Sequence, residues 1–311
     1  MIIAVDHGNK QIKLGANGRV FTSGLQENDT RPPFGEDILK YKDKYYTISD
    51  KRIPVMRDKT IDGRFYILNL FAIAYAILDA GHYISGLMSI RLLVGLPPAH
   101  YGAQYERFEA YFKHGGTDGF GGIEEFEFRG KKFKIHISEV VSFPQAFAAA
   151  MPVYGAINSL PKVMVIDIGG FTADYLLIKN GQADLSVCDS LENGVIILYN
   201  QIISRVNSAL DLLLDESDID AILKDARSPF GKEVSRIVND SAQTFISDLF
   251  SKLRERAIDL RSGKTVFVGG GSILLRRQIE TSDKVSSLIF IDKISANAKG
   301  YELLYRASKR G

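Results

Sequence analysis

The sequence predicts an α/β fold built from two domains of similar architecture. The chain has 311 residues, which is enough for two domains of ordinary size. Residues 1–15 and 163–179 are alike in kind: each reads as a strand, an aspartate, a glycine-containing turn and a second strand. We expect the two domains to face each other across a cleft. Each would offer a carboxylate and a loop of backbone N–H groups.

The elements of the first half follow from its apolar runs and its turn residues. Apolar runs that end at aspartate, glycine or proline predict strands. The apolar run at 65–78 is too short and too interrupted to span a bilayer, so it predicts a core helix. In order, we expect three short strands over 1–24, a polar turn-rich stretch over 26–60, a helix over 63–80, a buried strand over 90–98, an amphipathic helix over 99–115, a hairpin over 124–140 and a small-residue helix over 143–157.

The second half begins with VMVIDIGGFTADYLLIKNG, residues 163–181. Its two apolar runs predict strands, and its final Asn-Gly dipeptide predicts a turn into a third strand. The remaining elements are expected as a meander strand through 183–190, a long helix over about 194–214, a charged helical region over 215–260, a strand over 264–269, a helix over 272–280, a strand over 288–292 and a last helix over 296–308.

Composition excludes several classes of function. The formal net charge is +2, from 39 Lys and Arg against 37 Asp and Glu, which is too balanced to indicate direct nucleic-acid binding. Cys188 is the only cysteine, so there is no intramolecular disulfide, and a reducing cytoplasmic setting is expected. The five histidines form no i, i+4 pair and no G-x-S-x-G motif occurs, so neither a zinc site nor acyl transfer is supported. The MIIAVD start reads as a strand, not a signal peptide.

The first motif is DHGNKQIK, residues 6–13. Gly8 and Asn9 would place backbone donors in a hairpin turn, and Lys13 can return to the same site from the next strand. The second motif is DIGGFTAD, residues 167–174, in which Asp167 ends an apolar strand as Asp6 does. Carboxylates of this kind are hard-oxygen ligands suited to Mg²⁺, usually through water. Each motif, taken alone, also fits an ordinary glycine-rich turn.

Two further segments carry candidate site residues. Gly269, Gly270 and Gly271 join a buried strand to a helix, where glycines allow close approach of a ring or a ribose-phosphate and the helix start favours anions. Gln145 follows Pro144 at the start of a small-residue helix, and a carboxamide there could orient an attacking water. A tight strand-to-helix turn and a polar helix start are the plainer interpretations of these two segments.

Together and in this order, the motifs resemble those of the actin-like ATPase superfamily, which includes actin, sugar kinases and seventy-kilodalton heat-shock chaperones. DHGNKQIK resembles its first phosphate motif, DIGGFTAD its second and VGGGS its adenosine motif. FPQAFAA and ISANAKG resemble its two connecting helices between domains. The chain is most similar to bacterial ParM/StbA-type plasmid-segregation proteins, through its compact length, DGRFYILNLFAIAYAIL and LLVGLPPAHY.

The resemblance implies a two-lobed fold of two ribonuclease-H-like domains, with a nucleotide in the cleft between them. Domain I would cover 1–150, with a small subdomain inserted at about 24–88. Domain II would cover 151–311, with a small helical subdomain at about 212–260. Contacts with the β- and γ-phosphates are implied for Gly8, Asn9, Lys13, Gly169, Gly170 and Thr172, and contacts with adenosine for Gly269, Gly270 and Gly271.

By the same resemblance, Asp6 and Asp167 would hold hydrated Mg²⁺, and with Gln145 they are the candidate catalytic residues. ParM-like members usually carry Glu where this chain has Gln145, whereas actin has Gln. Either side chain can position water, so the departure leaves the rate of hydrolysis open. Asn193 and Arg277 are only candidates for the ribose contacts.

The resemblance implies a cytoplasmic bacterial ATPase that polymerises head to tail with ATP and Mg²⁺, and whose ATP hydrolysis drives plasmid segregation. Its partners would be further copies of the chain and a DNA-binding adaptor protein on the plasmid, with no direct contact to nucleic acid or membrane. A small-molecule kinase is the alternative, with Asp174 as its candidate base and no other sugar-binding signal. A chaperone-type ATPase is disfavoured because no β-rich client region follows residue 311. A membrane-tethered cytoskeletal protein is a further alternative, but neither end has a convincing amphipathic anchor.

Overall fold

The computed structural model is mixed α/β, as the sequence predicts, and describes residues 1–82, 86–117, 119, 121–225 and 229–310. The chain divides into two compact units. The first unit comprises Met1–Pro152 and Ser295–Gly311, and the second comprises Val153–Ile294. In the described parts of the chain, no helix is both long and apolar enough to cross a membrane.

Within the described residues of the first unit, nine strands form one sheet in the order β3-β2-β1-β7-β9-β8-β5-β6-β4. The parallel pairs β1/β7 and β7/β9 lie at its middle, and antiparallel pairs flank them. The strands are β1 (Ile2–His7), β2 (Gln11–Leu14), β3 (Val20–Thr22), β4 (Leu25–Asn28), β5 (Ile38–Tyr41), β6 (Lys44–Ile48), β7 (Leu87–Leu96), β8 (Ile123–Phe128) and β9 (Lys131–Pro144).

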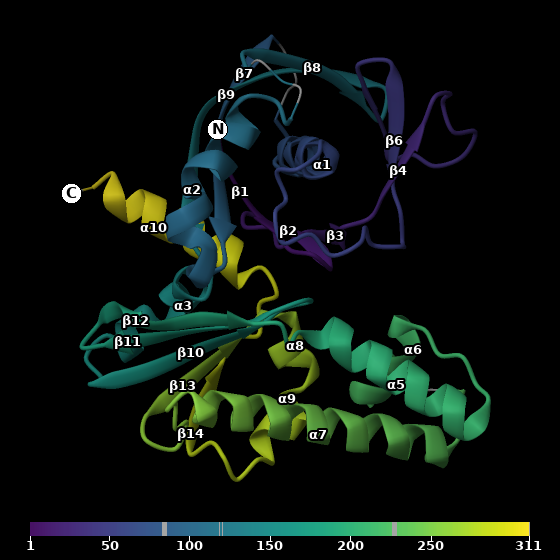
Figure 1. The fold of residues 1–311 in the computed structure, drawn as a ribbon. Helices are drawn as coiled ribbons and strands as arrows, with labels where there is room; N and C mark the ends of the chain where they lie inside the picture. The colour runs from purple at the N-terminus through teal and green to yellow at the C-terminus, as the bar shows by residue number, and fades with distance from the viewer. Residues whose placement is uncertain (83–85, 118, 120, 226–228, 311) are drawn as a thin grey trace. The chain divides into compact units, whose positions relative to one another are not determined.

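Helix α1 (Arg64–Asp79) is the core of this unit. Every residue from Phe65 to Ile77 is buried, which is typical of a helix that is apolar on all sides. In Figure 1 the helix is seen end-on, and the strands of the sheet pass around it. Helix α2 (Pro98–Lys113) starts with a proline at its first position, where the missing N–H costs nothing, and packs beside β9.

The helix predicted over 143–157 is wrong in its extent. Strand β9 continues to Pro144, and the chain then forms α3 (Phe147–Ala150), a short 3₁₀ turn and α4 (Tyr154–Ile157). Ala146 has φ of 58°, a left-handed conformation that ends the strand abruptly. Pro152 then interrupts the helical run, because it has no N–H to donate.

The last helix, α10 (Ala296–Ser308), belongs to the first unit and not to residues 151–311 as the domain prediction assigned it. It packs on α3, β1 and β7. Gly300 lies so close to α3 that a Cβ there would stand 1.8 Å from the carbonyl oxygen of Ala148. Tyr301 fills the space left by Gly95 of β7 and stacks on Phe143. These contacts hold α10 against the strand ends of the first unit.

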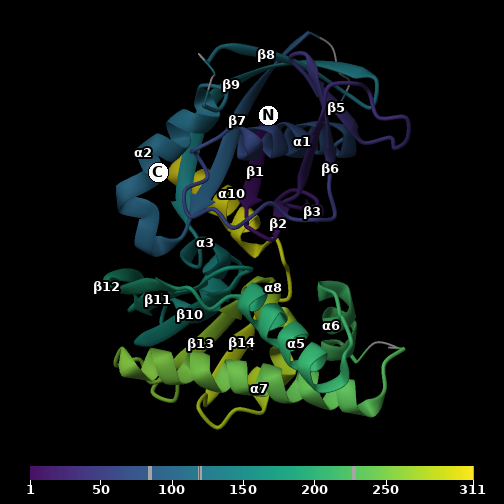
Figure 2. The same cartoon turned by 45° about the vertical axis from the view of Figure 1, so that its right-hand side comes forward.

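In the described residues of the second unit, five strands form a sheet in the order β12-β11-β10-β13-β14. Phe267 on β13 meets Phe250 on helix α7, with ring centroids 6.0 Å apart, and Figure 2 shows α7 passing across β13 and β14. The elements are β10 (Lys162–Ile168), β11 (Ala173–Lys179), β12 (Gln182–Leu191), α5 (Val195–Leu210), α6 (Glu216–Leu223), α7 (Lys232–Glu255), β13 (Lys264–Val268), α8 (Gly269–Leu274), α9 (Arg276–Glu280) and β14 (Ser287–Phe290).

Two helix boundaries in this unit differ from the prediction. Helix α5 ends at Leu210 because Asp211 adopts a left-handed conformation, with φ of 52°. The charged region then holds two helices, of which α6 begins at a capping box formed by Asp215 and Asp218. After β13 the helix starts at Gly269 and not at Ser272, since the first glycine itself makes the turn.

Candidate functional site

The first unit brings Asp6, Lys13 and Gln145 together. Asp6 lies at the end of β1 directly opposite Lys13 on β2, so the two side chains share one face of the sheet. Lys13 Nζ is 3.1 Å from Asp6 Oδ2, and Gln145 Nε2 donates to Asp6 Oδ1 at 2.9 Å. Asp6 is 2% exposed, and these two partners compensate the burial of its charge.

The hydrogen bond to Asp6 fixes the orientation of the Gln145 carboxamide. An ionised carboxylate only accepts hydrogen bonds, so the amide nitrogen faces Asp6 and the carbonyl oxygen Oε1 faces away. The backbone of Gln145 is held by its N–H, which donates to the carbonyl of Leu96 at 2.8 Å. The next residue, Ala146, donates its N–H to Asn297 Oδ1 of α10 at 3.0 Å. The motifs did not indicate this role of Asn297.

Gly8 and Asn9 form the turn between β1 and β2. A Cβ on Gly8 would stand 2.7 Å from the carbonyl oxygen of Gln11, so only glycine fits there. Asn9 Oδ1 accepts a hydrogen bond from the N–H of Met56 at 3.2 Å, so the protein itself uses this side chain. Among the described residues, no backbone carbonyl accepts from the N–H groups of Gly8 and Asn9. These two N–H groups are the donors that the turn can offer to an anion.

His7, inside the first motif, is a core residue. Its ring is fully buried, stacks on Phe112 at 4.6 Å and forms a 3.2 Å hydrogen bond between Nε2 and Asn69 Oδ1. Burial, and next to it the positive charge of Lys59, lower the pKa of His7 to about 3. His7 is therefore neutral at physiological pH, and its side chain is part of the core.

In the second unit, Asp167 is the next-to-last residue of β10 and lies directly opposite Asp174 on β11, and both are buried. The Thr172 hydroxyl donates to Asp174 Oδ2 at 3.2 Å. On the other side of β10, Asp167 is paired with Val268 of β13, so Gly269 follows beside it. Gly269 has φ of 87°, and a Cβ there would stand 2.2 Å from Asp167 Oδ1. The second and third motifs therefore meet at the Asp167 carboxylate.

The turn that contains Gly169, Gly170 and Thr172 is fastened to the start of α5. Its carbonyl oxygens accept from three successive N–H groups there: Gly194 to Phe171 at 2.8 Å, Val195 to Gly169 at 3.1 Å and Ile196 to Gly170 at 2.9 Å. Within the described chain, no backbone carbonyl accepts from the N–H groups of residues 170–172. Because the carbonyls face α5, those N–H groups are left for another acceptor.

The three glycines of the third motif differ in what they do. Gly271 packs against Ile168, where a Cβ would stand 2.5 Å from the side chain, so its role is close packing. Gly270 is less crowded, with 3.3 Å to Ile294. Of the ribose candidates, Asn193 Oδ1 accepts from Lys252 Nζ at 2.6 Å, and Arg277 is an exposed residue 3.5 Å from Asp225. Their ribose contacts stay predictions.

A cavity of about 890 Å³ in the first unit contains none of the predicted site residues. At its wall the Arg19 guanidinium lies 4.5 Å from the centre of the Tyr75 ring, and the Tyr75 hydroxyl donates to Asp37 at 2.7 Å. Arg19 pairs with Asp79, and Arg129 pairs with Asp37. Since Arg19, Arg129 and Asp37 are engaged in these pairs, they indicate no particular ligand.

Residues 165–281, which lie in the second unit, match the family model described as the C-terminal domain of the MreB-like archaeal actin homologue. The solved structure of actin-like protein Alp7A matches with a TM-score of 0.76 and 15% identity, over 100% of this chain and 97% of that one. The chain has an actin-like fold. This confirms the predicted α/β, actin-like fold.

Two further actin-like structures match at full length. ParM from Bacillus thuringiensis with ATP has a TM-score of 0.69 and 12% identity, over 99% of both chains. The Alp12 filament structure has a TM-score of 0.63 and 17% identity, over 99% of this chain and 98% of that one. No curated protein sequence matches the chain. At these identities the likeness establishes the fold.

Proposed function

We propose that this actin-like chain binds ATP with Mg²⁺, hydrolyses it and assembles into filaments. The observation that carries the proposal is the turn at residues 169–172. The carbonyls of Gly169, Gly170 and Phe171 are directed to the start of α5, and the Gly169 N–H is bonded to the Thr172 carbonyl at 2.8 Å. The N–H groups of residues 170–172 are therefore the donors that this turn can offer beside Asp167. Such a set suits a phosphate chain. The solved structure of ParM with ATP, which has this fold, supports the same assignment.

The first unit would supply a second set of phosphate contacts. Gly8 and Asn9 offer N–H groups, and Lys13 is a point charge of the kind that binds phosphate. We propose that each of the two turns binds nucleotide phosphate, as the repeat in the sequence predicts. Gly270 would pass beside the adenosine, while Gly269 and Gly271 would act by letting the chain pack closely.

Asp6 and Asp167 are better suited to bind Mg²⁺ through its water ligands than to coordinate the ion directly. Both oxygens of Asp6 already have partners within the protein, and the described residues contain no cluster of three His, Cys, Asp or Glu arranged to hold a metal. Mg²⁺ commonly keeps its waters and takes phosphate oxygens as ligands, so Asp6 and Asp167 would hold its water shell. The ion would supply neutralisation of the phosphate charge.

Gln145 is the proposed water-positioning residue. Its Nε2 is engaged by Asp6, so its Oε1 is free to accept a hydrogen bond from water and to orient that water toward the terminal phosphate. A kinase would instead need Asp174 as its base. That carboxylate accepts from Thr172 inside the β10–β11 hairpin, and no other observation favours a kinase.

Assembly is proposed to follow the head-to-tail pattern, in which one surface meets a different surface of the next copy and the chain of contacts does not close. The Alp12 filament structure, which shares the fold, supports self-association. Plasmid segregation through a DNA-binding adaptor is the finer proposal, and the near-neutral net charge of +2 agrees with an adaptor that makes the DNA contact.

Negative-stain microscopy with right-angle light scattering tests the proposal. Wild-type protein at micromolar concentration is expected to give filaments and rising scattering with Mg-ATP, and neither without it. The variant Asp167→Ala should lose both, while Asp248→Ala, which removes an exposed carboxylate on α7, should behave as wild type. Flat scattering in all samples, or full assembly by Asp167→Ala, would refute the proposal.

A further inference from the structure

The turn at Gly8 is held from behind by two residues that belong to none of the motifs. Lys59 Nζ donates to the carbonyl oxygen of His7. Ser23 Oγ donates to the carbonyl oxygen of Gly8 at 2.6 Å. Lys59 is 8% exposed and Ser23 is fully buried, so both bonds are shielded from water. The carbonyls of two successive residues, His7 and Gly8, therefore accept hydrogen bonds from buried side chains.

A trans peptide links these carbonyls to the donors of the turn. The C=O of one residue and the N–H of the next lie in one plane and point in opposite directions. The His7 carbonyl is directed to Lys59, so the Gly8 N–H points away from it. The Gly8 carbonyl is directed to Ser23, so the Asn9 N–H points away in the same manner. Lys59 and Ser23 thus set the direction of both N–H groups.

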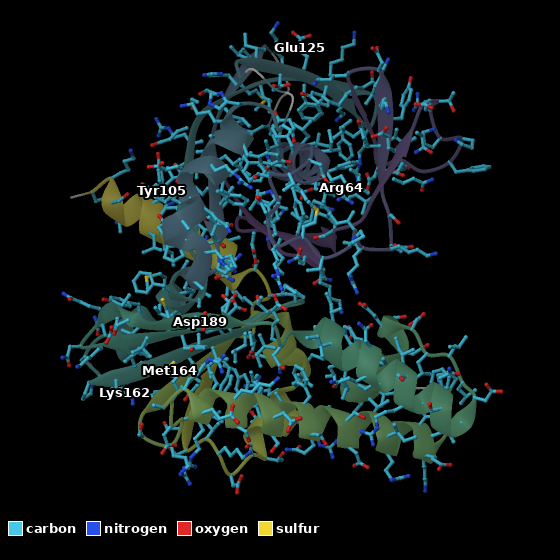
Figure 3. All side chains as sticks on the ribbon, viewed as in Figure 1. Arg64, Tyr105, Glu125, Lys162, Met164 and Asp189 are labelled. Atoms are coloured by element: carbon cyan, nitrogen blue, oxygen red, sulfur yellow. The ribbon has the colours of Figure 1, made fainter. Side chains whose placement is uncertain are left out.

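The segment that carries Lys59 is itself fastened to the turn. The Met56 N–H donates to Asn9 Oδ1 at 3.2 Å, and Arg64, labelled in Figure 3 at the start of α1, contacts the Met56 sulfur at 3.3 Å. Arg107 of α2 forms an ion pair with Asp58. Residues 56–59 therefore lie behind the turn and are held there by contacts with α1 and α2.

The chemistry of Lys59 suits more than a structural hydrogen bond. A lysine ammonium is rarely buried, since leaving water is costly for a charge. Here it lies 5.5 Å from the centre of the Phe65 ring, which favours a cation. Its charge lies close enough to His7 to oppose protonation of that ring. The ammonium therefore adds positive potential to the turn from the side opposite the donors.

We propose that Lys59 is a positioning residue for a phosphate group: it holds the His7 carbonyl and thereby aims the Gly8 N–H at the anion, while Ser23 does the same for the Asn9 N–H. The inference rests on the proposed nucleotide binding by this turn. It predicts that Lys59 affects affinity for the phosphates of a nucleotide and not for its adenosine part.

Lys59→Met tests this, because methionine keeps an unbranched apolar side chain and removes the donor and the charge. The affinity for Mg-ATP is expected to fall about ten- to a hundredfold, the range for loss of a charged hydrogen bond. The affinity for AMP, which lacks the outer phosphates, should change by less than about twofold. Lys51→Met, at an exposed lysine of the same unit, is the matched control and should bind as wild type.

A second readout works without nucleotide. The backbone amide resonance of Gly8 should shift in free Lys59→Met, and that of Asn9 in free Ser23→Ala, which removes only one hydroxyl and serves if Lys59→Met does not fold. An unmoved Gly8 resonance, or unchanged Mg-ATP affinity, would overturn the inference. So would an equal loss of ATP and AMP affinity, which indicates general damage. If wild type binds no nucleotide, the proposed function fails, and the resonances alone decide whether Lys59 and Ser23 set the turn.

Discussion

Gly300 is the position where a single methyl group should disturb the fold and the site together. It lies on α10 against the backbone of α3, and a Cβ there would stand 1.8 Å from the carbonyl oxygen of Ala148 and 2.3 Å from its carbonyl carbon. Cβ contacts below 3.0 Å are essentially not found, so the two helices would have to separate by at least 1.2 Å, the difference between 3.0 and 1.8 Å. The obstacle is backbone, which cannot turn aside as a side chain can.

Gly300→Ala has two opposing effects on the free energy of unfolding: overpacking lowers it, and the higher helix propensity of alanine raises it. Overpacking of this kind costs about 3 kcal/mol, near the upper end of its usual range, because α3 and α10 are both fixed to the sheet. Replacing glycine by alanine inside a helix returns about 1 kcal/mol. The free energy of unfolding should therefore fall by about 2 kcal/mol. Catalysis should fall as well, because α10 carries Asn297, which holds the residue after Gln145.

Urea unfolding followed by circular dichroism measures this change. The matched control is Gly102→Ala on α2, where no atom lies within 4 Å of the added methyl group. That variant should gain about 0.5–1 kcal/mol. Equal stability of the two variants, or a Gly300→Ala protein as stable as wild type, would refute the packing argument.

Three further predictions concern the site. Gly269→Ala forces a side chain into a backbone of φ 87° and onto Asp167 Oδ1, so Mg-ATP affinity in a fluorescence titration should fall at least about tenfold. Gln145→Ala should lower phosphate release about a hundredfold while the dissociation constant for Mg-ATP changes by less than about threefold; equal losses in both would argue against water positioning. The pKa of His7 is about 3 against 6.5 in the unfolded chain, so the unfolded state binds more protons between those values and stability should rise with pH across that window. His7→Gln should flatten that dependence, which is on the order of 5 kcal/mol in full, and an unchanged pH profile would contradict a neutral buried ring.

Helices and strands that are marked by a run of apolar residues can be predicted from the sequence. The largely apolar run of α1 and the two strands that flank the turn after Asp167 are confirmed, because burial on every side leaves a mostly apolar stretch. The break at Ala146 is not visible in this way, since alanine favours a helix and nothing near it signals φ of 58°. In that conformation the Ala146 N–H donates to Asn297, which lies 151 residues further along the chain.

In the candidate site, too, features set by neighbouring residues are predictable from the sequence, and features set by distant contacts are not. Asp6 and Lys13 are found by a motif because two short strands place them opposite each other. Lys59 and Ser23 could not be found from the sequence, since each acts by binding one backbone carbonyl, and such a bond leaves no repeating pattern. Helix α10 was assigned to the wrong unit because its chain position says nothing of the close contact that Gly300 allows.

The rate of phosphate release from Mg-ATP, measured over a range of protein concentrations, tests the central claim most directly. If nucleotide hydrolysis is coupled to assembly, the rate per molecule should be low in dilute protein and rise steeply above a threshold concentration at which filaments form. A rate per molecule that is the same at every concentration would contradict the coupling. No release at any concentration would contradict the ATPase itself.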